Sequence, residues 1–223
     1  SELAVLRERQ AAALPDGDAA RAALHEVAAL HERDGRTEAA VAGYQRVLER
    51  FPDDAVAHRA LLRLCAPGTA EAMAALEALT GSAEVDPASV AAAWLRAGVA
   101  LAGSEQRDAA VAAYRRVLEV GGDGAVAHAA AQQLLHVAER ERDASVQREM
   151  LAWLGERTVS PDVQAAMHHR AGWLAALWDS DHNGAAASFA AALRARPDHI
   201  AAAWGSAWTD AVAAGRRAGA AAG

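Results

Sequence analysis

Hydrophobic residues along the chain form helix-length stretches that are separated by short turns rich in proline, glycine and aspartate. One such stretch, 37–58, reads TEAAVAGYQRVLERFPDDAVAH, and it returns seventy residues later at 107–128 as RDAAVAAYRRVLEVGGDGAVAH. The two segments are identical at 14 of 22 positions. Self-similarity at a fixed period is typical of stacked repeats, so the sequence predicts a repeat array.

Bulky residues that each lie eight positions before a helix breaker mark the repeat along the chain. Successive bulky residues are 35, 35, 39 and 36 positions apart, close to the length of a helix-turn-helix unit, about 34 residues. Four of the five follow an alanine one helical turn earlier, which lets neighbouring helices interlock. Glu149 replaces this alanine in the fourth unit, which we expect to pack atypically. The five pairs are Tyr44 with Pro52, Leu79 with Pro87, Tyr114 with Gly122, Trp153 with Pro161, and Phe189 with Pro197.

The composition indicates an all-α protein. Alanine dominates, aromatic residues are few and Ile200 is the one isoleucine, so strand-forming residues are scarce. The 39-residue spacing falls at 125–142, where no clear break occurs, and predicts a longer helix there. Helices are expected at about 2–14, 18–33, 37–51, 54–65, 69–80, 88–103, 107–120, 124–141, 144–157, 162–178, 184–196 and 199–215.

We therefore expect a single α-solenoid over 1–215, with a short tail at 216–223 that is a frayed end or linker stub. Because each repeat contacts only its neighbours, an array of this length need not divide into compact domains. The segment 199–215 is interpreted as a helix that caps the last pair. The expected repeats cover about 18–52, 53–87, 88–122, 123–161 and 162–197.

Charge and cysteine content narrow the range of functions. The net charge of −7 argues against a nucleic-acid-binding protein, which normally carries a basic face. All 22 basic residues are arginine, so chemistry that needs a lysine is excluded. The single cysteine, Cys65, excludes an intramolecular disulfide and favours a cytoplasmic location, with a periplasmic one as the alternative. No apolar run is long enough for membrane insertion.

The repeat resembles the tetratricopeptide repeat, in which a small residue and large apolar residues on the first helix precede an alanine, an aromatic residue and a proline on the second. The third unit matches best, and the first and fifth are recognisable, whereas the second and fourth are degenerate. The match in the third unit is Trp94-x2-Ala97-Gly98-x2-Leu101 followed by Ala110-x3-Tyr114. The resemblance implies a right-handed superhelix whose first helices line a concave groove that holds a peptide or a partner's helix.

The resemblance also nominates groove-facing residues on the first helices. An arginine-bearing groove with an aromatic platform suits an acidic or amphipathic segment of a partner protein. The alternative is that these residues form an ordinary solvated helix face. The family's clamp for a C-terminal carboxylate needs lysine, which this chain lacks. The nominated residues are His25, Arg59, Arg63, Arg96, Gln133, His136, His169, Arg170 and Trp173.

Two further patterns in the last third suggest other chemistry. The turn with Asp179, Asp181 and Asn183 imitates the first half of a calcium loop, but Ala190 stands where the bidentate acid belongs, so no metal site is expected. Trp204 and Trp208 lie one helical turn apart, and they are interpreted either as core residues or as an exposed docking patch.

The sequence thus predicts a non-catalytic scaffold or adaptor that binds a peptide or protein in its groove, without a cofactor. No phosphate-binding loop and no arrangement of catalytic residues at a recognisable spacing is present. The alternative hypothesis is a structural or self-assembling segment of a larger repeat protein. It would associate, for example as a homodimer, through its tryptophan-rich C-terminal end.

Overall fold

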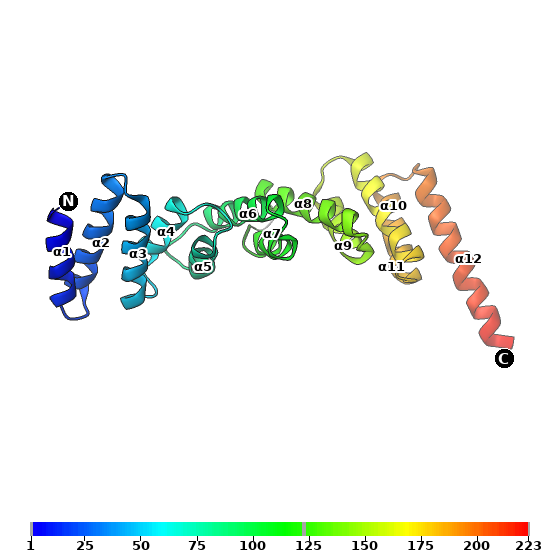
Figure 1. Cartoon of the computed structure of the whole chain (residues 1–223). Coiled ribbons are helices and arrows are strands. Elements are labelled where there is room, and N and C mark those ends of the chain that lie inside the picture. Colours follow the sequence, from blue (N-terminus) through cyan, green and yellow to red (C-terminus); the bar gives the residue numbers. More distant parts are fainter. Residues whose placement is uncertain (1, 122–123, 223) are drawn as a thin grey trace. The chain divides into compact units, whose positions relative to one another are not determined.

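The computed structural model describes residues 2–121 and 124–222, with side chains given except at 2–4, 12, 217 and 219–222. The described residues form twelve α-helices and no strand (Figure 1). Contacts divide the chain into two compact units, Ser1–Gly121 and Gly122–Gly223, and each is described by itself. The helix breaker predicted at Gly122 lies outside the described residues. The single continuous solenoid expected over 1–215 therefore stays a prediction.

The first unit contains seven helices in chain order. Each second helix packs against the first helix before it, as α3 does on α2 and α7 on α6. Their bounds are α1 (Glu2–Ala13), α2 (Asp18–Arg33), α3 (Thr37–Arg50), α4 (Ala55–Leu64), α5 (Ala70–Leu79), α6 (Pro87–Gly103) and α7 (Arg107–Gly121).

The second unit contains the remaining five helices. Helix α10 packs against α9 and α11, and the last helix packs against α11 and α10. Their bounds are α8 (Ala125–Glu141), α9 (Ala144–Arg157), α10 (Pro161–Leu177), α11 (His182–Ala195) and α12 (Ile200–Ala222).

The expected all-α fold is confirmed, and helix ends agree with the prediction within two residues except at the end of α12. The predicted frayed tail at 216–223 is wrong for its described part, because α12 continues to Ala222. Alanine and arginine are strong helix formers, and they make up most of this segment. No helix among the described residues is both long and apolar enough to span a membrane.

Polar caps fix where several helices begin. Asp86 accepts hydrogen bonds from the amides of Ala88 and Ser89 at the start of α6, whose first residue is Pro87. Asp181 accepts one from the amide of Gly184 at the start of α11. Such caps satisfy amides that have no partner within the helix, and proline suits the first helical position.

Close approach of glycine to an aromatic ring sets the spacing between helices. A Cβ added to Gly98 of α6 would lie 2.5 Å from Cε1 of Tyr114 on α7. Phe189 of α11 is held in the same way between Gly172 of α10 and Gly205 of α12. These aromatic residues and the alanine one turn before each are buried, so the interlocking expected from the sequence is confirmed.

The fourth repeat packs differently, as its glutamate predicts. Trp153 is only partly buried, and its ring lies 6.5 Å from that of His128, with the Arg157 guanidinium 4.2 Å from the ring centroid. Its role as the central bulky residue was therefore predicted wrongly. Met150, Leu151 and Leu154 fill the core instead, because α9 presents a face shifted by two to three residues.

Candidate functional site

The first helices α4 and α6 lack acidic residues although the chain as a whole is acidic. Their charged side chains are Arg59 and Arg63 on α4 and Arg96 on α6. Asp54 and Asp86 precede these helices and serve as their N-caps, so their carboxylates are directed at backbone amides. The first unit therefore carries two stretches of helix whose fixed charges are all positive.

Exposed apolar side chains lie beside these arginines. Val56 is 55% exposed and lies three residues before Arg59, whereas Val99 is 53% exposed and lies three residues after Arg96. Residues three apart share a helix face, so each helix presents a cation next to a valine. The sequence reasoning nominated the arginines and missed the valines, because an isolated valine is indistinguishable from a core residue until its burial is known.

The two helices are joined through the turn that follows α4. Gly68 in this turn has φ of +86°, a conformation that favours glycine. A Cβ at Gly68 would lie 3.2 Å from Cγ of Leu101, so the turn rests on the C-terminal part of α6. At the other end, the indole of Trp94 donates a hydrogen bond to Thr80 Oγ1, at 2.9 Å, and fastens α6 to the end of α5.

Arg63 is already paired within the protein. Its guanidinium makes two bonds to the carboxylate of Glu32 on α2, one of them 2.9 Å long, and the Tyr44 hydroxyl donates to the same carboxylate at 3.3 Å. The hydrogen bond from Arg63 lowers the pKa of Glu32, whereas burial and the neighbouring Glu32 charge raise the pKa of Tyr44. Arg63 thus links α2 to α4, and less of its charge is available to a partner.

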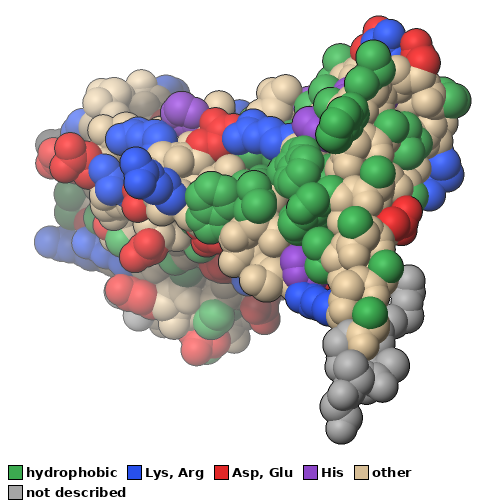
Figure 2. Space-filling view, turned by 90° about the vertical axis from the view of Figure 1, so that its right-hand side faces the viewer, with side chains coloured by type: hydrophobic (Ala, Val, Ile, Leu, Met, Phe, Trp, Pro, Cys, Tyr) green, Lys and Arg blue, Asp and Glu red, His purple; other side chains and the backbone are tan. Residues whose placement is uncertain are grey.

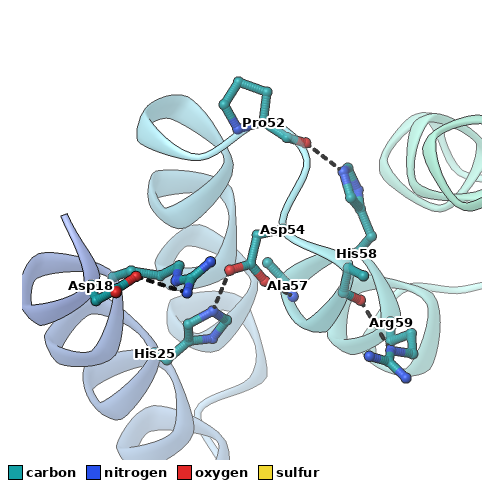
Figure 3. Close-up of polar contacts among 9 residues, drawn as sticks. Asp18, His25, Pro52, Asp54, Ala57, His58 and Arg59 are labelled. Carbon is teal, nitrogen blue, oxygen red and sulfur yellow. Dashed lines mark hydrogen bonds and ion pairs between the residues drawn. The ribbon is translucent and has the colours of Figure 1, made fainter. Parts of the chain in front are cut away.

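His25 is likewise paired within the protein (Figure 3). Its Nε2 lies 2.9 Å from Oδ2 of Asp54, and the other oxygen of Asp54 accepts the amide of Ala57 at 2.8 Å. Burial raises the pKa of Asp54, but the bonds from His25 and Ala57 outweigh burial, and the pKa lies below its ordinary value. His25 therefore supports the N-cap of α4.

Arg59 and Arg96 remain the exposed cations of this face. The Arg59 guanidinium donates one bond, 3.1 Å long, to the carbonyl of Ala55 on its own helix (Figure 3), and the residue is exposed. Arg96 is exposed near the middle of α6. We call Val56, Arg59, Arg96 and Val99 the basic face.

An ion pair of the same kind recurs in the second unit. Arg170 on α10 bonds to Glu139 on α8 at 2.8 Å, and the two are separated by 31 residues, as Glu32 and Arg63 are. Both pairs join the end of one first helix to the next first helix. Arg170 is therefore also neutralised internally. Gln133 and His136, nominated on α8, are exposed.

His169 and Trp173 are brought together as predicted, but they face the core of the second unit. The indole of Trp173 donates to Nε2 of His169 at 3.0 Å, and its ring lies 5.3 Å from Phe189 and 5.6 Å from Trp208. Burial, and then the neighbouring His199, lower the pKa of His169. Trp208 thus packs against the core, whereas Trp204 is exposed.

The calcium-like turn is occupied by an arginine. Arg148 lies 3.4 Å from Asp179 and 2.8 Å from Asp181, and Asp181 also caps α11. Asn183 lies within the first turn of α11. No group of three histidine, cysteine or acidic residues in the described part of the chain is arranged to hold a metal ion.

Successive helix pairs joined in this way define an all-α repeat solenoid. Residues 21–64 match the family model described as a tetratricopeptide repeat, and they span α2, α3 and α4. This part of the chain is therefore identified as a tetratricopeptide repeat.

Among solved structures, the chain is similar to one titled "Crystal structure of YrrB: a TPR protein with an unusual peptide-binding site". The two share 18% sequence identity, and the alignment covers 81% of this chain and 88% of the other, with a TM-score of 0.36. No curated protein matches the sequence.

Proposed function

We propose that this protein is a non-catalytic interaction module whose basic face binds an acidic, partly apolar segment of another protein. The observation that carries the proposal is the placement of Arg59 and Arg96, exposed and beside exposed valines, on two helices without an acidic residue. The repeat fold supports it, since stacked helix pairs create extended surfaces suited to binding.

The chemistry of the basic face determines the kind of segment that fits. A guanidinium stays charged at every physiological pH and forms strong bonds with carboxylates. The neighbouring valines offer apolar area to a leucine or similar side chain. A segment that alternates carboxylates with apolar residues along one helix face satisfies both, whereas a purely acidic chain leaves the valines exposed to water.

A designed peptide tests this proposal directly. The probe is a fluorescein-labelled peptide of sequence EELLEELLEELL, compared with KKLLKKLLKKLL, and binding is followed by fluorescence anisotropy. Loss of a charged hydrogen bond costs about 1.5–3 kcal/mol, so Arg59→Gln with Arg96→Gln should weaken binding of the acidic peptide at least tenfold. Because exposed charges are screened by salt, raising the salt concentration should weaken binding further.

A matched control separates a local effect from the loss of two charges. Arg9→Gln with Arg140→Gln removes the same charge from exposed positions elsewhere, and it should change the affinity less than twofold. Circular dichroism verifies that both variants are folded. Equal affinity of the folded Arg59/Arg96 variant and the wild type would contradict the proposal, as would preference for the basic peptide.

A further inference from the structure

Helix α12 has a second apolar face that points away from the rest of its unit. Ala202, Gly205 and Thr209 are buried against the preceding helices. On the opposite side Ile200 is 75% exposed and Trp204 is 74% exposed. Exposed alanines continue this line toward the C-terminus. The outer seam consists of Ile200, Trp204, Ala207, Ala211, Ala214 and Ala218.

The spacing of the outer seam is that of a coiled coil. Its residues follow one another at intervals of four, three, four, three and four, which is the heptad repeat of a helix that packs along another helix. All six are apolar, and together they span 19 of the 23 residues of α12, the longest helix among those described. Figure 2 faces this end of the chain and shows hydrophobic side chains spaced along the last helix.

The order of large and small residues makes the seam complementary to itself. The two large residues lie in its N-terminal part, and the other four positions are alanine. In an antiparallel pair of seams, Trp204 of one copy lies opposite Ala214 of the other. Ile200 then faces Ala218, and Ala207 faces Ala211. A parallel pair would place Trp204 against Trp204, which leaves gaps beside the alanines.

We propose that α12 is a homodimerisation helix, and that two copies of this chain associate through their outer seams in antiparallel orientation. This surface is distinct from the basic face and lies in the other compact unit. The contact is about 27 Å long at 1.5 Å per residue, which corresponds to a small interface. We therefore expect a reversible dimer with a micromolar dissociation constant.

One residue beside the seam reports on this register. Asp210 is exposed and flanks the seam between Ala207 and Ala211. In the antiparallel pair, the two copies of Asp210 lie next to the two-fold axis, where like charges oppose association. The substitution Asp210→Asn should therefore tighten the dimer. A gain in affinity is informative because a misfolded variant does not produce it.

Sedimentation equilibrium of the 223-residue chain tests the proposal. Protein concentrations between about 1 and 200 μM cover the range in which a dimer with a micromolar dissociation constant forms. The expected result is a monomer–dimer equilibrium that Trp204→Ala weakens at least tenfold and Asp210→Asn strengthens about threefold. Trp178→Ala is the matched control, since Trp178 is also an exposed tryptophan of the second unit but lies outside the seam, and it should leave the equilibrium unchanged.

Three outcomes would overturn the proposal. The first is a monomer at every concentration. The second is equal weakening by Trp204→Ala and Trp178→Ala, which would indicate nonspecific apolar contact. The third is growth beyond the dimer, since a two-fold pairing of one seam closes on itself. Peptide binding to the basic face is measured separately by anisotropy, so failure of one proposal leaves the other standing.

Discussion

Adding one methyl group to Gly98 is the sharpest test of how this fold is held together. Gly98 lies on α6 directly against the ring of Tyr114, which is 1% exposed. A Cβ at position 98 would lie 2.5, 2.7 and 3.1 Å from Cε1, Cδ1 and Cζ of that ring. Real Cβ atoms do not approach a ring so closely, so Gly98→Ala forces α6 and α7 apart.

Two opposing effects set the size of the change. Overpacking of a core costs about 1–3 kcal/mol. Because the Tyr114 ring is buried, we expect the cost at position 98 to lie toward the upper end of this range. Alanine in a helix interior is favoured over glycine by about 1 kcal/mol. We therefore expect Gly98→Ala to lower the free energy of unfolding by about 2 kcal/mol, which is the difference between these magnitudes.

The same helix supplies the control. Gly103 ends α6, and among the described residues no heavy atom outside the local backbone lies within 4 Å of a Cβ built there. Gly103→Ala should therefore be neutral or stabilise the protein by less than about 1 kcal/mol. Urea unfolding followed by circular dichroism compares both variants with the wild type.

A double-mutant cycle isolates the contact. When Tyr114→Leu removes the ring, Gly98→Ala should become stabilising, because only the gain in helix propensity remains. The sign of the alanine effect thus reverses between the two backgrounds. An alanine variant as stable as the wild type, or an equal loss in both backgrounds, would refute steric contact with Tyr114 as the cause.

Two further predictions concern polar groups. Asp54→Ala removes the cap of the Ala57 amide and the partner of His25, so thermal unfolding should show that the free energy of unfolding falls by about 1–2 kcal/mol. Asp54→Asn keeps an acceptor and should lower this free energy less. An equal decrease in both variants would contradict the capping role. Burial lowers the pKa of His168 and of His169 in the folded protein, so the unfolded chain binds more protons as the pH falls. Stability of the second unit should therefore decrease as the pH falls through about 6.5, as followed by tryptophan fluorescence in urea, and replacing both histidines with glutamine should flatten this dependence.

The helices and their order could be predicted from sequence because the signals are local. Proline, glycine and capping aspartates determine where a helix begins, and Asp86 and Ser160 do so at the predicted positions. The fourth repeat shows the limit of this reasoning. Spacing pointed to Trp153, but the choice between neighbouring apolar residues of α9 depends on which face meets α8 and α10. That face is determined by tertiary packing.

The candidate site was predicted less completely, because the sequence does not show which charges are already paired. Arg59, Arg63 and Arg170 are equivalent in sequence, yet Arg63 and Arg170 bond to glutamates 31 residues earlier. The constant separation of 31 residues was present in the sequence and could have indicated these pairs. The exposure of Val56 and Val99 had no such sign, since both are apolar residues on helices with otherwise buried faces.

The position of Phe189 has a consequence for motion at the end of the chain. Its ring is enclosed by the backbones of Gly172 and Gly205, with ring atoms 2.5–3.0 Å from the points where a Cβ would lie. A flat ring in such a slot turns over only when α10 and α12 briefly separate, because a densely packed core leaves no free volume. The rate of ring rotation therefore measures how often the last helix lifts from its unit. Ring rotation of Phe189 is thus a direct measure of the opening of α12.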